Sequence, residues 1–421
     1  MEFPSDSCVD LLPPGWSCFS ARHEDRPFDS RLTLFEERES SFGLTPCIKA
    51  KGRDARLCVL ANLVCLREDQ WSFYSRDNNH YAGLGRYAPG CCRRRWICGA
   101  VDELTMAGLI EDERTRPSPS ARYRSRMQPT ARFWSLASTI PARDVVFAPA
   151  EVIILRNVDG DRVHYADTRL TKGMRVDVME QNEFLAGVDI GIDHPQIVDA
   201  QGFLLVNGCR VPPRKTSLHR VFNCTFGKGG RWYGGWWQNL RSSARQAILI
   251  DGEATIEEDI ACCHPHFLLA AQGQELGSDD FYGRVKRPRG NVKLAVNVML
   301  NAPSRRKAFG ALRKKLEPIY GLTAGKQAAD LVQAVEDTFP ELSTFWNKGV
   351  GLVLQNIDAQ LCSWILHRLR YANIACLSIH DSFIAKGVDH AALRNVMQEG
   401  LERAHNSLRE KGLSNKSIKI F

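Results

Sequence analysis

The chain lacks cysteines at the spacing of a zinc-binding motif. It contains 14 cysteines, but none forms a Cys-x-x-Cys pair, and the adjacent pairs Cys91-Cys92 and Cys262-Cys263 do not supply spaced metal ligands. Several other cysteines lie in apolar stretches, where a reduced thiol packs as a small hydrophobic group. We therefore expect free thiols, as in a cytoplasmic protein, and neither a zinc knuckle nor a disulfide framework.

Long apolar runs and a leader segment are also lacking. No run approaches the about 20 residues that a membrane-spanning helix needs, and the N-terminus carries acids and prolines in place of a basic-then-apolar leader. These absences predict a cytoplasmic protein with no membrane partner. The composition, 44% apolar and 25% charged, is that of an ordinary globular protein, and 421 residues predict two or three domains.

The net charge of +8 is modest, but the basic residues are clustered. Clusters occur at residues 93–95, 284–289 and 305–315, as in proteins that bind phosphates. Solvated surface charge is the alternative interpretation of such runs.

The N-terminal third predicts an arm followed by a DNA-binding domain. Residues 1–50 are rich in proline, serine and charge, and we expect an extended arm. Apolar periodicity predicts helices over residues 56–66 and 93–109, and a basic hairpin follows up to residue 134. A helix followed by a basic hairpin resembles a winged-helix domain, here over residues 51–135. We expect DNA contacts from the cationic residues of the second helix and the hairpin: Arg93, Arg94, Arg95, Arg122 and Arg124.

A winged helix used only for packing or protein contacts is the alternative. Residues 136–219 are expected to be a connecting region, with a charged helix over 168–185 and a short hairpin at Asn207-Gly208. We assign this region no function.

The composition changes near residue 220. Residues 227–237 combine glycines, cations and aromatic residues and predict a loop beside phosphates. Two alternating runs joined by Asp251-Gly252 then predict a β-hairpin. Its second strand places Glu257 and Asp259 on one face and runs into an apolar helix over residues 267–271. This layout suits a metal site at a strand end; an exposed acidic strand end is the alternative.

Further along, a helix carries Arg289, Lys293, Asn297 and Leu300 at about one turn apart, which predicts a shared stripe. The first two suit a triphosphate, and the other two lie further along toward a base and sugar. An amphipathic helix over 352–369 has Gln355 near its start, and His380-Asp381 follows at a turn between two short apolar strands. A last helix is expected over 391–404.

This order of motifs resembles the family A DNA polymerases and the single-subunit RNA polymerases of bacteriophages and mitochondria. Asp259 and His380-Asp381 match their two catalytic motifs. Arg289-x-x-x-Lys293 followed by Leu300-Asn301 is similar to the fingers motif, and Gly230-Arg231 to a segment near template and product. The resemblance covers residues 220–421. It implies an α+β fold in which an N-terminal winged helix precedes a minimal right-hand palm and fingers with an antiparallel sheet.

The resemblance implies a nucleotidyltransferase that copies a DNA template from nucleoside triphosphates. Asp259 and Asp381 would hold two Mg²⁺ ions, or Mn²⁺, with the backbone carbonyl of Ile260 completing a metal shell. Arg289 and Lys293 would neutralise the triphosphate. The remaining expected contacts are to the nucleotide or the nucleic acid, from His264, Asn297, Leu300, Arg231, Gln355 and His380.

At three positions the chain differs from the family A DNA polymerases, and these differences bear on whether the product is RNA or DNA. Ser382 follows His-Asp, as in the phage-type RNA polymerases, where DNA polymerases have Glu. His264 stands where DNA polymerases carry a sugar-discriminating Glu, and Leu300 replaces the fingers Tyr. These differences favour RNA over DNA slightly. Two alternatives remain open: a winged-helix replication initiator or regulator with a non-catalytic palm, and a metal-dependent nuclease using Glu257, Asp259, His264 and His266.

Overall fold

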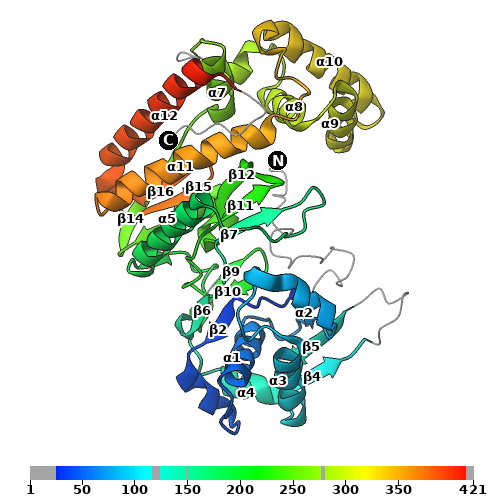
Figure 1. Cartoon of the computed structure of the whole chain (residues 1–421), viewed down its shortest axis with the longest axis vertical. Coiled ribbons are helices and arrows are strands. Elements are labelled where there is room, and N and C mark those ends of the chain that lie inside the picture. Colours follow the sequence, from blue (N-terminus) through cyan, green and yellow to red (C-terminus); the bar gives the residue numbers. More distant parts are fainter. Residues whose placement is uncertain (1–24, 116–123, 148–149, 276–279, 414–421) are drawn as a thin grey trace. The chain divides into compact units, whose positions relative to one another are not determined.

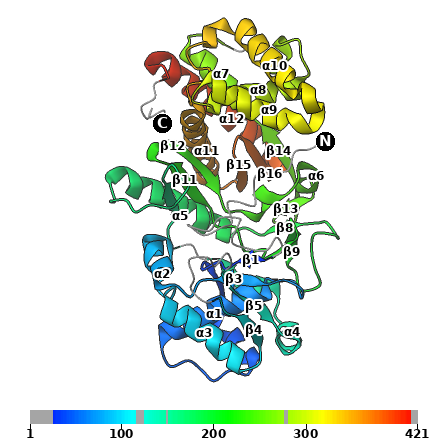
Figure 2. The same cartoon turned by 90° about the vertical axis from the view of Figure 1, so that its right-hand side faces the viewer.

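The computed structural model describes residues 25–115, 124–147, 150–275 and 280–413. The fold is mixed α and β with mostly antiparallel strand pairs (Figures 1 and 2). The chain divides into two compact units. The first comprises the chain up to Arg220 together with Tyr233–Ile256, and the second comprises Val221–Trp232 and the chain from Glu257 onward. Within the described ranges, no helix is long and apolar enough to cross a membrane.

The first unit begins with alternating helices and short strands. In chain order these are β1 (Arg26–Pro27), α1 (Ala50–Val64), β3 (Ser72–Tyr74), α2 (Asn78–Leu84), α3 (Arg94–Met106), β4 (Ile110–Glu113) and β5 (Ser125–Pro129). The strand order is β1-β3-β5-β4, and β5 is antiparallel to both β3 and β4. Helix α1 is buried from residue 55 to residue 64 because its apolar residues occupy every side. Helix α3 is amphipathic, with Ile97, Val101 and Leu104 buried.

Residues 25–49 belong to this core, so the predicted extended arm is wrong for this stretch. Strand β2 (Leu32–Leu34) pairs with β6 (Val145–Phe147), and the 3₁₀-helix η3 (Glu36–Phe42) follows. Phe28 and Phe42 are almost fully buried. The apolar residues occur in runs too short to give a periodic signal. Residues 1–24 lie outside the described residues.

The first unit continues through the region predicted as a connection. Its elements are α4 (Ala131–Ala137), β7 (Ile153–Arg156), α5 (Arg169–Ala186), β8 (Ile190–Ile192), β9 (Leu204–Val206), β10 (Cys209–Val211), α6 (Ser242–Arg245) and β13 (Ile248–Ile250). Thr168 caps α5 with Thr171 in a capping box. Both predicted hairpins are confirmed: Asn207-Gly208 and Asp251-Gly252 have positive φ angles at both turn residues.

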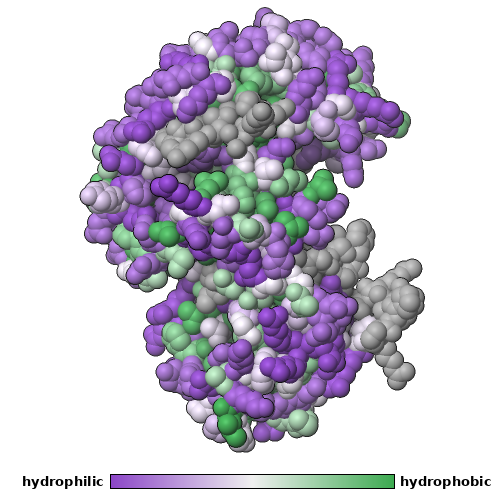
Figure 3. Space-filling view, in the orientation of Figure 1, coloured by the Kyte–Doolittle hydropathy of each residue, from purple (hydrophilic) through white to green (hydrophobic). Residues whose placement is uncertain are grey.

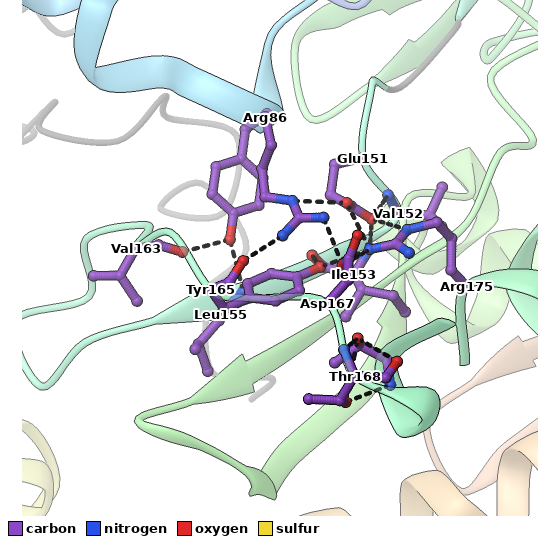
Figure 4. Close-up of polar contacts among 12 residues, drawn as sticks. Arg86, Glu151, Val152, Ile153, Leu155, Val163, Tyr165, Asp167, Thr168 and Arg175 are labelled. Atoms are coloured by element: carbon purple, nitrogen blue, oxygen red, sulfur yellow. Dashed lines mark hydrogen bonds and ion pairs between the residues drawn. The ribbon is translucent and has the colours of Figure 1, made fainter. Parts of the chain in front are cut away.

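A network of two arginines and two carboxylates ties several of these segments together (Figure 4). Glu151 accepts two bonds from Arg175 at 3.0 Å, one from Arg86 at 3.0 Å and two from backbone N–H groups. Asp167 accepts from both arginines at 2.8 Å, and Arg86 stacks 3.9 Å above the ring of Tyr165. Every charge in this network therefore has a partner of opposite sign.

The second unit contains a strand, a helical group and a hairpin. Its elements include β12 (Thr225–Tyr233), α7 (Cys263–Ala271), α8 (Arg289–Asn301), α9 (Arg305–Tyr320), α10 (Ala324–Thr338), α11 (Gly351–Tyr371), β15 (Cys376–Ile379), β16 (Ser382–Lys386) and α12 (His390–Lys411). Strand β16 pairs with β15 and also neighbours β14 (Glu253–Asp259). Helix α11 packs against α7 and α12, and α8, α9 and α10 pack together. The prediction of a loop over residues 227–237 is wrong for its first part, which is the strand β12.

Candidate functional site

Two aspartates lie at neighbouring positions on the sheet of the second unit. Asp259 is the last residue of β14, and Asp381 lies in the turn between β15 and β16. The backbone N–H of Ile260 donates to the backbone carbonyl of Asp381 at 3.0 Å, which ties the strand end to the turn. Asp259 is exposed and Asp381 is partly exposed. The structure thus brings together the two carboxylates that the sequence singled out.

The turn that carries Asp381 is tight and strained. Ile379 pairs with Ser382, so His380 and Asp381 form a two-residue hairpin turn. His380 has φ 62°, in the left-handed region that costs a residue with a Cβ atom about 1–2 kcal/mol. Backbone strain of this kind persists where the surroundings enforce it, and it gathers at functional sites.

The glutamates next to Asp259 have partners of their own. Glu257 accepts a hydrogen bond from the hydroxyl of Ser382 at 2.6 Å, and Glu258 pairs with His390 at the start of α12. The carboxylate of Asp381, by contrast, makes no hydrogen bond or ion pair with any residue that the structure describes. The glutamates hold β14 in place and leave the Asp381 carboxylate available.

The aspartates share one electrostatic environment with the start of α8. Burial raises the pKa of the Cys263 thiol, and the charges of Asp381 and Asp259 raise it further. Burial also raises the pKa of Cys262, and Arg289 and Lys293 act on the same thiol in the opposite direction. The two cations thus act on one cysteine and the two carboxylates on the next cysteine along the chain.

Helix α8 presents Arg289, Lys293 and Asn297 on its exposed side, as predicted. Leu300 departs from the predicted stripe, because only 1% of it is exposed. The last turn of α8 is covered: the backbone N–H of Asn347 donates to the carbonyl of Met299 at 2.8 Å. Leu300 is therefore part of the core and is not placed to contact a nucleotide.

Arg289 already has partners in the free protein. It donates to Asp280 at 2.6 and 3.2 Å, and its guanidinium lies 5.4 Å from the centre of the Tyr282 ring. The hydrogen bond from Arg289 lowers the pKa of Asp280. A phosphate approaching Arg289 must compete with this carboxylate, whereas Lys293 has no such partner among the described residues.

Asp358 of α11 is a buried hub that joins two of the predicted site residues. Arg231 on β12 donates to it at 2.5 and 3.0 Å, and Nε2 of His264 on α7 lies 3.1 Å away. Burial acts to raise the pKa of Asp358, but the hydrogen bond from His264 and the charge of Arg231 lower it overall. Asn356 also fixes β12 by donating to the carbonyl of Gly229 at 3.0 Å.

Arg231 and His264 therefore link β12 and α7 to α11 through Asp358. Each has a side chain that is 18% exposed, so both remain reachable at their edges. Of the other expected contacts in this unit, Gln355 on α11 and His380 are partly exposed.

The predicted DNA-binding arginines lie in the first unit. Arg93, Arg94 and Arg95 are exposed at the start of α3, where Arg95 stacks 4.5 Å from the Trp96 ring. Arg124 is partly buried beside His80 at 3.5 Å, so it is less available than predicted. Arg122 lies outside the described residues.

Sequence reasoning missed the partners that organise this site. Asp280, Tyr282 and the role of Asp358 gave no signal, since each is a single polar residue within an otherwise unremarked segment.

A pocket of about 460 Å³ was also missed; it is lined by residues that include Arg305, Trp346, Asn347 and Lys348. Asn347 has φ 60° and is 9% exposed, and its side-chain oxygen accepts no bond from a described residue.

A basic surface follows α8. Helix α9 buries one stripe, Ala308, Leu312 and Leu316, and exposes its remaining length. Much of the molecular surface seen in Figure 3 is hydrophilic. The exposed cations of α9 are Arg305, Arg306, Lys307, Arg313, Lys314 and Lys315. Their spacing suits a backbone of phosphates.

Asp259 and Asp381 offer the carboxylate oxygens that a divalent cation prefers. In the described ranges, no group of three or more His, Cys, Asp or Glu side chains is placed to hold a metal ion. Mg²⁺ is usually bound by one or two carboxylates together with substrate phosphates and water, and only rarely by a cage of protein ligands. Asp259 and Asp381 supply hard oxygen donors of that number and kind.

No family model matches the chain, and no curated protein matches it.

Proposed function

We propose that this protein is a cytoplasmic template-directed nucleotidyltransferase, a polymerase that copies DNA with a slight preference for RNA over DNA as product. The observation that carries the proposal is the backbone bond between Ile260 and Asp381, which sets Asp259 and Asp381 at adjacent strand ends. The cations at the start of α8 act to lower the pKa of the Cys262 thiol, and these carboxylates raise that of the neighbouring Cys263 thiol. Carboxylates beside a triphosphate-binding helix are what two-metal phosphoryl chemistry requires.

Each residue has a definite task in this proposal. Asp259 and Asp381 would hold two Mg²⁺ ions, which lower the pKa of a 3′-hydroxyl and stabilise the pyrophosphate when bound. Lys293 binds the triphosphate directly, since no carboxylate of the described residues competes for it. Arg289 exchanges Asp280 for a phosphate oxygen as the nucleotide enters. Arg231 and His264 keep α7, α11 and β12 in register through Asp358.

We further propose that the first unit contains a winged-helix domain that holds duplex DNA, ahead of a palm and fingers in the second. The order α1-β3-α2-α3-β4-β5 and the antiparallel strand order β3-β5-β4 support the winged helix. Arg93, Arg94 and Arg95 stand at the N-terminus of α3, where the helix dipole adds to their charge. These cations would contact the phosphate backbone.

A DNA-binding replication initiator or regulator with a non-catalytic palm is the second candidate. The exposed arginines of α3 favour it, because they would serve a regulator equally well. A metal-dependent nuclease has less support. Its expected ligands are engaged elsewhere, since Glu257 binds Ser382, His264 binds Asp358 and His266 stacks on His405.

The test is nucleotide incorporation by the purified full chain with Mg²⁺. The protein is incubated with a primed single-stranded DNA template and NTPs in one reaction, and with the same template and dNTPs in another. Parallel reactions contain an unprimed template. We expect extension with at least one nucleotide set, and loss of extension in Asp259→Asn. The preferred sugar and the need for a primer then define the class of polymerase.

A matched control separates chemistry from folding. Glu258→Gln alters a neighbouring carboxylate of the same strand that pairs with His390, so extension should persist. The absence of incorporation with either nucleotide set, together with tight duplex binding that Arg94→Gln and Arg95→Gln weaken, would favour the regulator instead.

A further inference from the structure

The first unit contains a second, separate group of charged residues around a small cavity. The cavity has a volume of about 30 Å³, and Asp29, Arg31 and Arg162 contribute to its lining. Lys215 lies next to this group: Arg31 and Lys215 lie 4.6 and 5.6 Å from the centre of the same Phe147 ring. One aromatic ring thus has two cations against it.

The positive charges in this group outnumber the negative ones. Arg31 binds the carboxylate of Asp29 at 2.8 and 2.9 Å, and this pair is satisfied. Arg162 and Lys215 have no hydrogen-bond or ion-pair partner for their side chains among the described residues. Three cations against one carboxylate leave two positive charges unmatched. Lys215 is only 7% exposed, so water offers it little compensation.

Burial and neighbouring cations outweigh Asp29 at these positions. Burial lowers the pKa of Lys215 to about 8; the charge of Asp29 acts to raise it, and the charges of Arg31 and Arg26 lower it further. Burial lowers the pKa of Arg162 to about 10, again with help from neighbouring cations. His219 shows the same pattern, and its Nδ1 is buried without a hydrogen-bond partner among the described residues. Lys215 is still mostly protonated at pH 7, so the charge is present and unmet.

Two properties of the group select the ligand. Two unmatched cations call for a dianion, and a guanidinium pairs with phosphate oxygens in a planar fork. The cavity is far below the several hundred cubic ångströms of a drug-sized ligand site, so a nucleobase does not fit. We propose that Arg31, Arg162 and Lys215 bind a phosphoryl group, either free phosphate or the terminal phosphate of a nucleic acid. This inference does not depend on the polymerase proposal.

Calorimetric titration of the full chain with inorganic phosphate at constant ionic strength tests the proposal. We expect one binding site, and a dissociation constant that rises at least tenfold in Lys215→Met and in Arg162→Gln. Lys172→Met removes an exposed lysine of α5 in the same unit and should leave binding unchanged. Lys215→Arg keeps the charge and should retain binding, which separates lost charge from lost folding.

A second arm identifies the source of the phosphoryl group. Short single-stranded DNA with a 5′-phosphate is compared with the same DNA carrying a 5′-hydroxyl. Tighter binding of the phosphorylated strand that is lost in Lys215→Met assigns the site to a nucleic-acid end, and binding of phosphate alone assigns it to the free ion. The proposal is overturned if wild type binds neither phosphate at millimolar concentration nor the 5′-phosphate selectively. Undiminished binding by folded Lys215→Met and Arg162→Gln would overturn it too.

Discussion

Two arginine clusters in the first unit differ in whether each positive charge is paired with a carboxylate. Arg86 and Arg175 face Glu151 and Asp167, and each charge has a partner of opposite sign. Arg31 binds the carboxylate of Asp29, whereas Lys215 and Arg162 have no hydrogen-bond or ion-pair partner among the described residues. The first arrangement is complete by itself and holds segments together. The second leaves charge for a ligand to neutralise.

The second unit also contains one complete charged group and one charge without a bonded partner among the described residues, and there the charge is negative. Arg231, His264 and Asp358 form a complete buried group, while the carboxylate of Asp381 has no bonded partner among the described residues. Polar groups that are already satisfied support a fold, and polar groups held in place without partners indicate a binding site. The predictions that follow test this distinction.

The largest expected effect on stability comes from breaking the complete network. Glu151→Gln leaves Arg86 and Arg175 facing only Asp167, and Glu151 has a side chain that is 5% exposed. Removing one partner of a buried ion pair costs about 3–5 kcal/mol. Urea denaturation should show a loss of about 3 kcal/mol or more. Asp167→Asn is the control: its side chain is 37% exposed, and the loss of stability should be much smaller than in Glu151→Gln.

Lys293 tests whether an unmatched cation marks the nucleotide site. Lys293→Gln removes a charge-assisted contact to the triphosphate, worth about 1.5–3 kcal/mol. The KM for nucleotide should rise at least tenfold, with little change in stability, because the Lys293 side chain has no partner within the described ranges. Lys326→Gln, an exposed lysine on α10, should leave KM unchanged. Equal effects of the two substitutions would contradict the assignment.

The lowered pKa of Lys215 should make the stability of the folded protein rise with pH. Its pKa is about 8 in the folded protein, below the ordinary value of 10.5. Between these values the unfolded chain binds more protons than the folded one, so stability rises with pH over this interval. Denaturation at pH 7.5 and pH 9.5 should show a gain in wild type that Lys215→Met lacks. An identical pH dependence in both proteins would show that Lys215 is not destabilised by its surroundings.

His380 tests the strained turn. His380→Gly removes the penalty for a positive φ angle and should raise stability by about 0.5–1 kcal/mol. Nucleotide incorporation should fall at the same time, because the proposed contact with nucleic acid is lost. A loss of stability in this variant would mean that the imidazole is needed for folding.

The smallest effect is expected at Asp280. Asp280→Asn weakens a bond of Arg289 that an incoming triphosphate must displace. The KM for nucleotide should fall by only about two- to threefold, because both side chains are substantially exposed. Steady-state kinetics across a nucleotide titration measures the change, and an increased KM would show that Asp280 positions Arg289 for binding.

Sequence patterns located the elements with strong local signals. The Asp251-Gly252 and Asn207-Gly208 hairpins follow from turn chemistry, and α8, α11 and α12 from long apolar periodicity. The stretch from 25 to 49 and strand β12 were misassigned, because short strands acquire their partners only through tertiary pairing.

The candidate site was predictable only in part. The strand-end positions of Asp259 and Asp381 follow from local pattern, and so does the exposure of Arg289 and Lys293. The partners of these residues could not be predicted from local pattern. Asp280 and Arg289 are nine positions apart, and Asp358 and Arg231 are 127 positions apart. The last turn of α8 accepts a backbone hydrogen bond from Asn347, nearly fifty positions away. No periodicity reports such contacts.

The most direct measurement is single-turnover nucleotide incorporation by Asp381→Asn across a range of Mg²⁺ concentrations. Asp381 makes no side-chain bond with a described residue, so the variant should fold and bind primed template like the wild type. We predict that its incorporation rate falls at least about a thousandfold, roughly 4 kcal/mol of transition-state stabilisation. Incorporation at the wild-type rate with unchanged Mg²⁺ dependence would contradict the account.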